Sequence, residues 1–408
     1  MNIVRPQKIK RVKPSKAPKG GTPVRHVGVP DLGTDLIPKE RYTTTDFMDL
    51  EWEKVWTKVW LLGGRECDIP EPGDFIATEI GRESILLVRQ KDGRIRAFYN
   101  VCLHRGNQLA PAGIGQAEDG FVCSYHGWHY DVDGSLDRVP DLETFRQGKP
   151  CDRLVELPCD TWGSFIWFSL NPDAEPLRDY LDIIPSHMDP YHFERMVQTR
   201  DITVEWDCNW KASVDAFNET YHVQATHKQL LWYLDDINIQ IDCYKKHSRY
   251  LVPFGCISPR RPYPPEIPAP IKAMMHEAGM DPASYEGDKT KIREAIQQHK
   301  RKHGIEQGKD YTELNDDQLT DDYNYLLFPN ITLNTHADGL MLFRHRPHPT
   351  DPNKMYFDIW TFVLPTEEER KEWEKEERPR PRHRFYRGDE KSLGLVVNQD
   401  GGNLPRVQ

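Results

Sequence analysis

Long hydrophobic runs are absent from this sequence. No stretch of about 18 apolar residues, the minimum for a membrane-spanning helix, occurs in its 408 residues. Apolar residues make up 38% of the chain and charged residues 29%, an ordinary balance for a protein of two or three domains. The N-terminal residues also lack the apolar segment of a secretory signal. We therefore expect a cytoplasmic protein with no membrane segment.

Cysteine is scarce, and its scarcity excludes one class of protein. Eight of the 408 residues are cysteine, far too few for a disulfide scaffold. Because no export signal is present, the thiols should stay reduced. Paired cysteines in this chain therefore indicate metal binding before disulfide bonding.

A surplus of positive charge is also missing. The net charge is −10, and it is about −17 (−10 minus 7) without the seven basic residues among the first nineteen. Because so acidic a body repels polyanions, we expect no nucleic-acid partner. The basic segment itself predicts a disordered tail, with an arm that binds nucleic acid or a protein partner as the alternative.

Composition changes divide the chain into three parts. Residues 1–40 are rich in Pro, Gly and Lys and are predicted to be a tail and linker. Residues 41–172 begin with a helix opened by Asp46 and continue as short strands, with turn signals at Asp92-Gly93 and Asp133-Gly134. This pattern predicts a small β-rich domain.

Residues 173–408 are predicted to form a second domain in which strands and helices mix. A polar segment that is rich in proline at its start, residues 257–320, is interpreted as an insertion or lid. The charged run at residues 366–390 predicts a solvated face. The expected strands lie at residues 202–208 and 331–363, and the expected helices at 211–230 and 288–303, the latter with Asp288 as N-cap and Gly304 as its end.

The strongest chemical signal is a pair of motifs, Cys102-Leu-His104 and Cys123-Ser-Tyr-His126, separated by eighteen residues. Two chemistries fit two thiolates and two imidazoles. Zinc takes such a set tetrahedrally as a structural site. A [2Fe–2S] cluster takes the two thiolates on one iron and the two imidazoles on the other.

Three features favour the cluster over zinc. Zinc fingers pair Cys with Cys and His with His, whereas each motif here contributes one of each, so one loop can supply both irons. Gly106 and Gly127 follow the two motifs closely and allow the backbone to approach with N–H donors for the cluster sulfurs. The loops also lie between predicted strands, and no finger helix follows them.

The residues around both motifs carry a family resemblance. Cys-x-His-Arg-Gly and Cys-x-x-His-Gly-Trp, as they stand at residues 102–106 and 123–128, resemble the Rieske motif of ring-hydroxylating oxygenases. His129 lies near the motif but off its spacing and is expected to pack or to support a ligand. The cluster ligands that the resemblance implies are Cys102, His104, Cys123 and His126.

A second signal is the spacing of His222 and His227, which lie five residues apart. On a regular helix they would point about 140° apart, so both can face one metal only if the helix is bent or has a wide turn. The zinc-protease pattern needs a four-residue spacing and is excluded. Two histidines and a carboxylate on one face of Fe(II) would leave positions open for O₂.

The string Asn-Trp-Lys … Glu-x-Tyr-His-x₄-His at residues 209–227 is similar to one in the same oxygenase family. The resemblance implies that His222 and His227 bind a mononuclear iron, with a carboxylate near the C-terminus as third ligand. Asp400 stands at the expected place, and Asp389 and Glu390 are the rival ligands. The two glycines after Asp400 are expected to weaken any helix that continues from it.

Glu219 lies three residues before His222 and is expected to share a helix face with it. In the family, a carboxylate at this position bridges the iron-bound histidine and a cluster histidine of the neighbouring subunit. The resemblance therefore implies that Glu219 contacts His222 and His126 of the partner subunit, within a ring-shaped homotrimer. Glu in place of the commoner Asp favours a trimer without a small β subunit, although that subunit stays possible.

The resemblance also implies the fold and the activity. The fold is α+β, with a β-rich Rieske domain and a helix-grip catalytic domain built on an antiparallel sheet. The enzyme would use O₂ on an aromatic or other apolar substrate, with electrons from NAD(P)H arriving through a flavin reductase, a ferredoxin or both. Ring dihydroxylation is favoured over monooxygenation and over oxidative O- or N-demethylation.

Two alternatives belong to other classes of protein. One is a Rieske electron carrier with a non-catalytic second domain, and the other is a zinc-stabilised binding module. Residues that flank the iron ligands are candidates for the substrate pocket, with ordinary helix packing as the other explanation. These pocket candidates are Phe217, Asn218, Val223 and Leu231.

Overall fold

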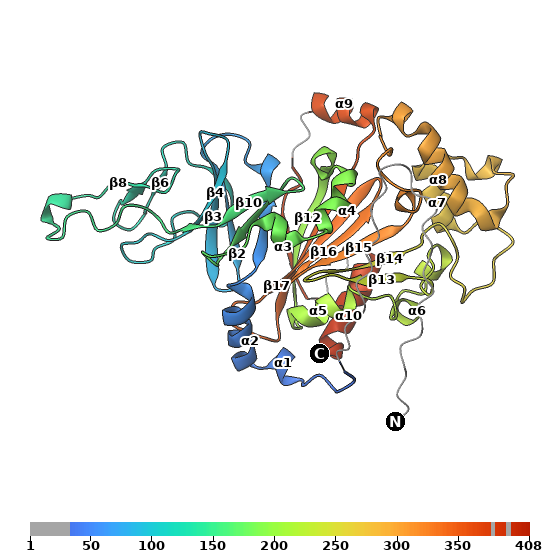
Figure 1. Cartoon of the computed structure of the whole chain (residues 1–408), viewed down its shortest axis with the longest axis horizontal. Helices are drawn as coiled ribbons and strands as arrows, with labels where there is room; N and C mark the ends of the chain where they lie inside the picture. Colours follow the sequence, from blue (N-terminus) through green and yellow to red (C-terminus); the bar gives the residue numbers. More distant parts are fainter. Residues whose placement is uncertain (1–32, 377–379, 389–392) are drawn as a thin grey trace. The chain divides into compact units, whose positions relative to one another are not determined.

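The computed structural model describes residues 33–376, 380–388 and 393–408 (Figure 1). The basic segment at residues 1–19, for which the sequence predicts a disordered tail, lies outside the described residues. The chain separates into two compact units. The β unit comprises residues 44–185 and 347–352, and the mixed unit comprises residues up to 43, 186–346 and 353–408.

Three antiparallel sheets build the β unit, in the orders β1-β11-β10, β5-β2-β3-β4-β9 and β6-β7-β8. The predicted turns at Asp92-Gly93 and Asp133-Gly134 join neighbouring strands, and both glycines have positive φ. The strands are β1 (Trp60–Arg65), β2 (Asp74–Ile80), β3 (Glu83–Arg89), β4 (Ile95–Tyr99), β5 (Gly113–Gln116), β6 (Phe121–Val122), β7 (His129–Tyr130), β8 (Leu136–Arg138), β9 (Glu156–Leu157), β10 (Cys159–Trp162) and β11 (Phe165–Ser169).

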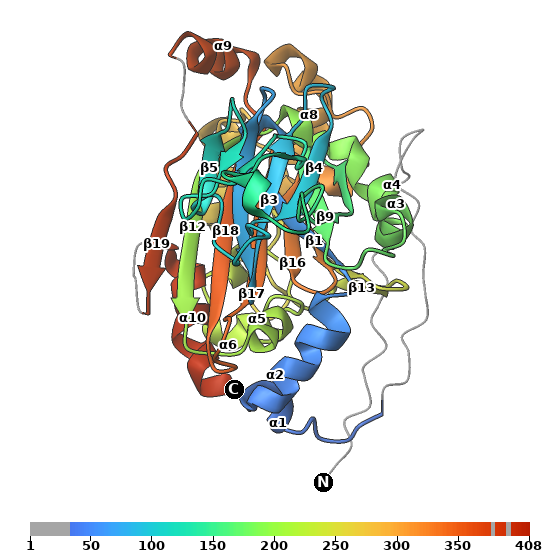
Figure 2. The same ribbon diagram turned by 90° about the vertical axis from the view of Figure 1, so that its left-hand side faces the viewer.

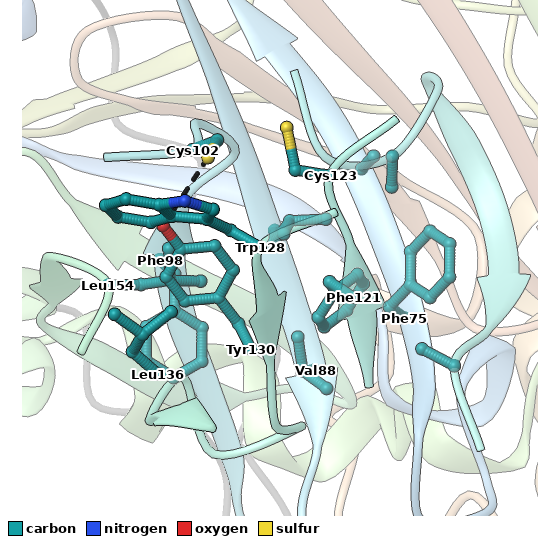
Figure 3. Close-up of a cluster of buried hydrophobic side chains, with 14 of the residues drawn as sticks. Phe75, Val88, Phe98, Cys102, Phe121, Cys123, Trp128, Tyr130, Leu136 and Leu154 are labelled. Atoms are coloured by element: carbon teal, nitrogen blue, oxygen red, sulfur yellow. Dashed lines mark hydrogen bonds between the residues drawn. The ribbon is translucent and has the colours of Figure 1, made fainter. Parts of the chain in front are cut away.

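One apolar core of the β unit leads directly to the Cys/His motifs. Side chains from β2, β3, β4 and β7 pack together, and Cys102 and Cys123 lie at one end of this cluster (Figure 3). Trp128 and Tyr130 are buried beside the cysteines. Burial of each aromatic ring of this size stabilises the folded state by about 2–3 kcal/mol, so these side chains hold the two motif loops in place.

The helix at the start of the β unit begins earlier than the sequence predicted. Thr44 is the N-cap of α2 (Thr45–Glu51), because its hydroxyl accepts a hydrogen bond from the backbone N–H of Phe47. Asp46 was the predicted opening residue and lies in the first turn, where its charge suits the positive end of the helix dipole. The helix widens into the π-turn η1 (Trp52–Trp56) before β1.

The mixed unit is built on one eight-stranded sheet, in the order β13-β14-β15-β16-β17-β18-β12-β19. Neighbouring strands are antiparallel except for β12 and β19. The strands are β12 (Val197–Trp206), β13 (Gln240–Cys243), β14 (Ser248–Val252), β15 (Asp322–Leu327), β16 (Ile331–His336), β17 (Gly339–Pro347), β18 (Met355–Val363) and β19 (Arg384–Arg387). Together with the β unit, this sheet confirms the predicted α+β class.

The longer helices of the chain lie mainly in the mixed unit. In both views, α5 and α10 lie side by side next to the sheet (Figures 1 and 2). The helices besides α2 are α1 (Glu40–Thr43), α3 (Leu177–Leu181), α4 (Ile184–Met188), α5 (Trp210–Ala216), α6 (Val223–Thr226), α7 (Ala269–Glu277), α8 (Ile292–His303), α9 (Glu367–Lys375) and α10 (Leu395–Val407). None of the helices in the described part of the chain has the length and apolar character needed to cross a membrane.

Of the two helices predicted in this unit, one is observed and the other is interrupted. The predicted helix at 288–303 is confirmed as a 3₁₀ turn (Lys289–Lys291) with Asp288 as N-cap, followed by α8 and ended by Gly304. The predicted helix at 211–230 is wrong, because the chain leaves the helix after Ala216 and resumes it only in α6. The interrupted turn is held by Glu219, whose carboxylate accepts from the backbone N–H of His222 and so replaces a helical hydrogen bond.

The segment at residues 257–320 has a small core of its own. Its apolar side chains come mainly from α7 and α8 and include Ile271, Met275, Ile292 and Ile296. The charged run after residue 365 starts with α9, which is closed by a reciprocal capping box between Thr366 and Glu369 and buries none of its side chains. The solvated face predicted there is therefore observed over α9.

The C-terminal helix continues past the two glycines that follow Asp400. α10 runs without interruption through Gly401 and Gly402 to Val407, although the sequence predicted that these glycines would weaken it. Gly401 is required by packing, because a Cβ at this position would lie 2.9 Å from Nε1 of the buried Trp206. Glycine at this position lowers the helix propensity of α10 but allows the helix to pack closely against β12.

The two neighbouring glycines give a paired prediction about stability. We expect Gly401→Ala to lower the free energy of unfolding by about 1–3 kcal/mol, because the methyl group overpacks against Trp206. Gly402→Ala should raise it by up to about 1 kcal/mol, because nothing lies within 4 Å of its Cβ and alanine favours helix. Urea unfolding of both variants measures the difference. Equal effects of the two substitutions would contradict the packing argument.

Candidate metal centres

The two Cys/His motifs form a pair of matching loops. In the first, the backbone N–H of Cys102 donates to the carbonyl of Asn107, and the N–H of Gly106 donates to the carbonyl of Cys102. The second loop repeats both bonds: the N–H of Cys123 donates to the carbonyl of Trp128, and the N–H of Gly127 donates to the carbonyl of Cys123. Both glycines have φ near +70°, a conformation that side chains disfavour.

The expected backbone N–H donors to sulfur come from residues beside the glycines and not from the glycines themselves. Their N–H groups bond to carbonyl oxygens inside the loops and are not directed at sulfur. Other backbone groups approach the thiols instead. Although burial opposes ionisation, hydrogen bonds from the backbone of Tyr125 and His126 lower the pKa of Cys123. Burial raises the pKa of Cys102, which a bound metal would offset.

The four motif side chains gather at one end of the β unit. Cys102 and Cys123 are buried and free of disulfides. The rings of His104 and His126 lie with centroids 4.5 Å apart, and His104 stacks on Trp128 at 4.8 Å. The Nδ1 atom of His104 is buried without a hydrogen-bond partner.

This donor set fits a binuclear cluster better than a single ion. A zinc ion would draw all four donor atoms to about 2.0–2.3 Å from one point. Among the described residues, the group of three or more donors that meets within single-ion distance lies elsewhere, in the mixed unit. Two thiolates, two imidazoles and an unsatisfied buried ring nitrogen are what a [2Fe–2S] cluster of this type requires.

His129, which the sequence placed near the motif but off its spacing, takes a supporting position. Its Nδ1 lies 2.9 Å from the carboxylate of Asp137, and its Nε2 contacts the carbonyl of Asp119. The hydrogen bond to Asp137 raises the pKa of His129. Both ring nitrogens are thus occupied within β7 and its neighbours.

Tyr130 offers a test of the electrostatics around Cys102. Its oxygen accepts from the N–H of Leu103, which leaves the O–H free to donate to the sulfur 3.5 Å away. We expect Tyr130→Phe to lower the reduction potential of the cluster by about 40 mV, because the substitution removes a hydrogen bond worth about 1 kcal/mol. For one electron, a tenfold change in the equilibrium constant corresponds to 59 mV. Protein-film voltammetry measures this shift, and Tyr99→Phe in β4 is the control. An unchanged potential would contradict the assignment of Cys102 as a ligand.

The second centre is a metal triad, His222, His227 and Asp400, whose donor atoms all lie within 4.8 Å of one another. The Nε2 atoms of His222 and His227 lie 3.8 Å and 2.8 Å from the same Asp400 oxygen. The two imidazole rings are nearly perpendicular, with centroids 5.0 Å apart. His227 and Asp400 are only 2% and 5% exposed, so the triad has a buried side and an accessible one at His222.

The broken helix explains how a five-residue spacing brings both histidines together. His222 directly precedes α6 and His227 directly follows it, so the short helix turns the two rings toward one point. Asp400 arrives from the middle of α10, 173 residues later than His227. The Nδ1 of His222 lies 2.5 Å from the Glu219 carboxylate, although the two residues share a turn and not the predicted helix face.

The triad has the features of a site shaped for a metal. Nε2 of His227 is buried and has no hydrogen-bond partner, even though an oxygen of Asp400 lies 2.8 Å away. The donor atoms of all three residues lie close enough together for one ion to reach them. Burial opposes protonation of His227, but the carboxylate of Asp400 outweighs it and raises the pKa of the ring. Two imidazoles and one carboxylate are a suitable set for Fe(II) with open positions.

The structure describes the four pocket candidates but not the two rival ligands. Asp389 and Glu390 lie outside the described residues. Phe217 stacks against aromatic rings of β17 and β18, and the amide oxygen of Asn218 accepts from the hydroxyl of Ser248. Val223 and Leu231 are buried in an apolar cluster with side chains of β14.

A cavity of about 770 Å³ opens beside the triad, and no motif predicted it. One wall comes from α5 and the turn after it, and the other comes from one face of α10. The predicted linker, which ends at residue 40, and the two residues after it close the edge of the cavity, where Tyr42 donates a hydrogen bond to Asp215. The metal-facing end is formed by Glu219, His222 and Asp400.

Family comparisons agree with this division of sites. The family described as the catalytic domain of the ring-hydroxylating alpha subunit matches residues 193–408, more than half of the chain. The Rieske [2Fe-2S] domain matches residues 59–155. The first match contains the metal triad and the second contains both Cys/His motifs.

Curated relatives share part of the chain. The glycine betaine monooxygenase oxygenase subunit of Pseudomonas aeruginosa is 30% identical over 200 residues, 48% of this chain and 45% of that protein. The benzene 1,2-dioxygenase alpha subunit of Pseudomonas putida is 36% identical over 196 residues, 45% of this chain and 42% of that protein. The matched segment thus spans less than half the length of these relatives.

Solved structures show the same fold over most of the chain. A quaternary ammonium Rieske monooxygenase with L-carnitine bound has a TM-score of 0.62 at 17% identity, over 91% of this chain and 84% of that one. Naphthalene 1,2-dioxygenase with indole bound has a TM-score of 0.63 at 22% identity, over 88% and 77%. With both of its domains matched, the chain belongs to the ring-hydroxylating alpha subunits of the Rieske non-haem iron oxygenases.

Proposed function

We propose that this chain is the catalytic subunit of an oxygenase that uses O₂ and externally supplied electrons to hydroxylate an apolar organic substrate. The observation that carries the proposal is the convergence of His222, His227 and Asp400 on one point. An electron carrier with a non-catalytic second domain has no need of that buried triad. The four Cys/His residues of the β unit supply the proposed site for the electron-transfer cluster.

The proposed ligands divide the work between the two centres. Cys102, His104, Cys123 and His126 would hold a [2Fe–2S] cluster, and the metal triad would hold one Fe(II). When bound, the cluster supplies single electrons and the mononuclear iron supplies O₂ activation.

The protein's own part in the chemistry begins with fixing tautomers. Glu219 accepts a hydrogen bond from Nδ1–H of His222, which leaves Nε2 free for the metal. The burial of His227 and Asp400 keeps bulk water away from one side of the centre. The cavity beside Glu219 leaves the other side approachable.

The electron path is proposed to cross between two copies of the chain. Glu219 lies at the cavity with its carboxylate toward His222, and Tyr221 beside it is 80% exposed. On the β unit, Tyr125 next to His126 is 56% exposed. Large exposed aromatic side chains are enriched at protein interfaces. A homotrimer in which Glu219 meets His126 of the partner subunit would use both surfaces, and a small β subunit stays possible.

The substrate class follows from what related proteins act on and from the surroundings of the triad. The relatives' names include benzene, biphenyl and glycine betaine, so the family handles both arenes and small aliphatic compounds. The cavity beside the triad is lined in part by apolar side chains, among them Ala212, Ala216 and Leu404. We favour ring dihydroxylation of an apolar compound, with monooxygenation or O- or N-demethylation as the alternative outcome. A flavin reductase, with or without a ferredoxin, would deliver the electrons.

Oxygen uptake and isotope incorporation test the proposal. Purified protein with a reductase and NADH should consume O₂ only when a substrate is present. With ¹⁸O₂, two labelled oxygens in the product indicate dihydroxylation, and one indicates monooxygenation. Cluster reduction without substrate-dependent O₂ uptake, across a panel of arenes and quaternary amines, would favour the electron carrier instead.

A further inference from the structure

The two histidines of the metal triad are supported by chemically different partners. His222 is held by the Glu219 carboxylate, which bears a charge. His227 is held by a neutral amide, because its Nδ1 lies 2.8 Å from Oε1 of Gln399. Neither the Rieske motif nor the spacing of the two histidines predicts Gln399.

We propose that Gln399 is a positioning residue that fixes the tautomer and the ring plane of His227, with Gln229 holding the Gln399 amide in place. This inference rests on the proposed metal site. Gln399 directly precedes Asp400 on α10, so two neighbouring residues of one helical turn contact both ring nitrogens of His227. Nδ1 is held by Gln399, and Nε2 faces Asp400.

The hydrogen-bond network fixes which way each amide points. Nε2 of Gln229 donates to Oε1 of Gln399 at 2.7 Å, and the same oxygen faces Nδ1 of His227. An amide oxygen can only accept, so Nδ1 must carry the ring proton. Nε2 of His227 is then left as a lone pair, which agrees with its lack of a hydrogen-bond partner.

The reverse arrangement is incompatible with a metal ligand. If the Gln399 amide were rotated, its N–H₂ group would face Nδ1 and would move the ring proton to Nε2. Rotation of the Gln399 amide alone would also set its N–H₂ group against the N–H₂ group of Gln229, so the Gln229 amide would have to rotate with it. Because His227 is buried, water cannot easily replace its hydrogen bond to Gln399, and burial therefore favours the tautomer with the proton on Nδ1.

Iron affinity in variants of the full chain tests this role. After chelation of the holoenzyme and anaerobic titration with Fe(II), Gln399→Leu should raise the Kd about 10–100-fold, the usual effect of losing a partner of a metal-bound histidine. Gln229→Leu should act in the same direction but less. Gln399→Glu should restore the affinity, because a carboxylate also accepts from Nδ1. The electron paramagnetic resonance spectrum of the nitric oxide adduct should change in Gln399→Leu and differ again in Gln399→Glu.

A matched glutamine separates positioning from packing. Gln224 of α6 donates to the carbonyl of Tyr221 in the same segment, and Gln224→Leu should leave the iron Kd unchanged. The inference is overturned if Gln399→Leu binds iron as wild type does, or if Gln399→Glu weakens binding as much as Gln399→Leu. If wild type and Asp400→Ala bind Fe(II) equally, the proposed function fails with it, and the two failures are thereby distinguished.

Discussion

Asp400→Ala should abolish substrate-dependent O₂ uptake while leaving the visible spectrum of the cluster unchanged. The carboxylate is 5% exposed and faces both imidazoles, and among the described residues it is the acid whose oxygen lies within single-ion distance of both rings. Loss of a partner that merely supports a ligand costs about 10–100-fold, and loss of a ligand should cost more. We therefore expect turnover to fall by more than about 100-fold, together with loss of the mononuclear iron.

Two variants control for indirect effects of the Asp400 substitution. Asp316→Ala removes a carboxylate that pairs with Arg301 in the 257–320 segment, and turnover should be unchanged. Asp400→Asn keeps the shape of the side chain but removes its charge, so it should weaken iron binding without disturbing α10. If Asp400→Ala retained both its iron and its turnover, the third ligand would have to be sought elsewhere.

Glu219→Gln should separate electron transfer from metal binding. The substitution keeps an acceptor oxygen near Nδ1 of His222, so iron and cluster contents should stay as in wild type. It removes the charge proposed to draw His126 of the partner subunit to the same carboxylate. Multiple-turnover rates should fall by about 100-fold, at the upper end for a residue that supports a ligand.

The decisive readout is the fate of the reduced cluster. When substrate and O₂ are added to the reduced wild-type protein, the cluster should reoxidise within one turnover, whereas in Glu219→Gln it should stay reduced. Glu313→Gln is the matched control, because Glu313 also pairs with a histidine, His192, away from both centres. Normal reoxidation of the cluster in Glu219→Gln would remove the proposed path between subunits.

Patterns in the sequence were enough for the fold class and the β unit. Turn signals at Asp92-Gly93 and Asp133-Gly134 fall where strands meet, and the predicted helix starts with Asp288 as the N-cap of a 3₁₀ turn and ends with α8 at His303. These features are local, since a turn or a cap is decided by a few neighbouring residues.

Features that depend on distant residues were not visible. The five-residue spacing of the two histidines required a bend in the helix, but it could not place the break at Phe217, between α5 and α6. Local propensity predicted a weak helix after Asp400, but Trp206 of a distant strand needs the space that Gly401 leaves. Gln399 belongs to no motif, and its role is seen only once α10 lies against His227.

The metal and sulfide content of anaerobically purified protein is the most direct test of the account. We predict about three irons and two acid-labile sulfides per chain, with Asp400→Ala losing one iron and no sulfide. One zinc per chain with no sulfide would contradict it, because neither the paired Cys/His loops nor the buried triad would then hold what their geometry fits.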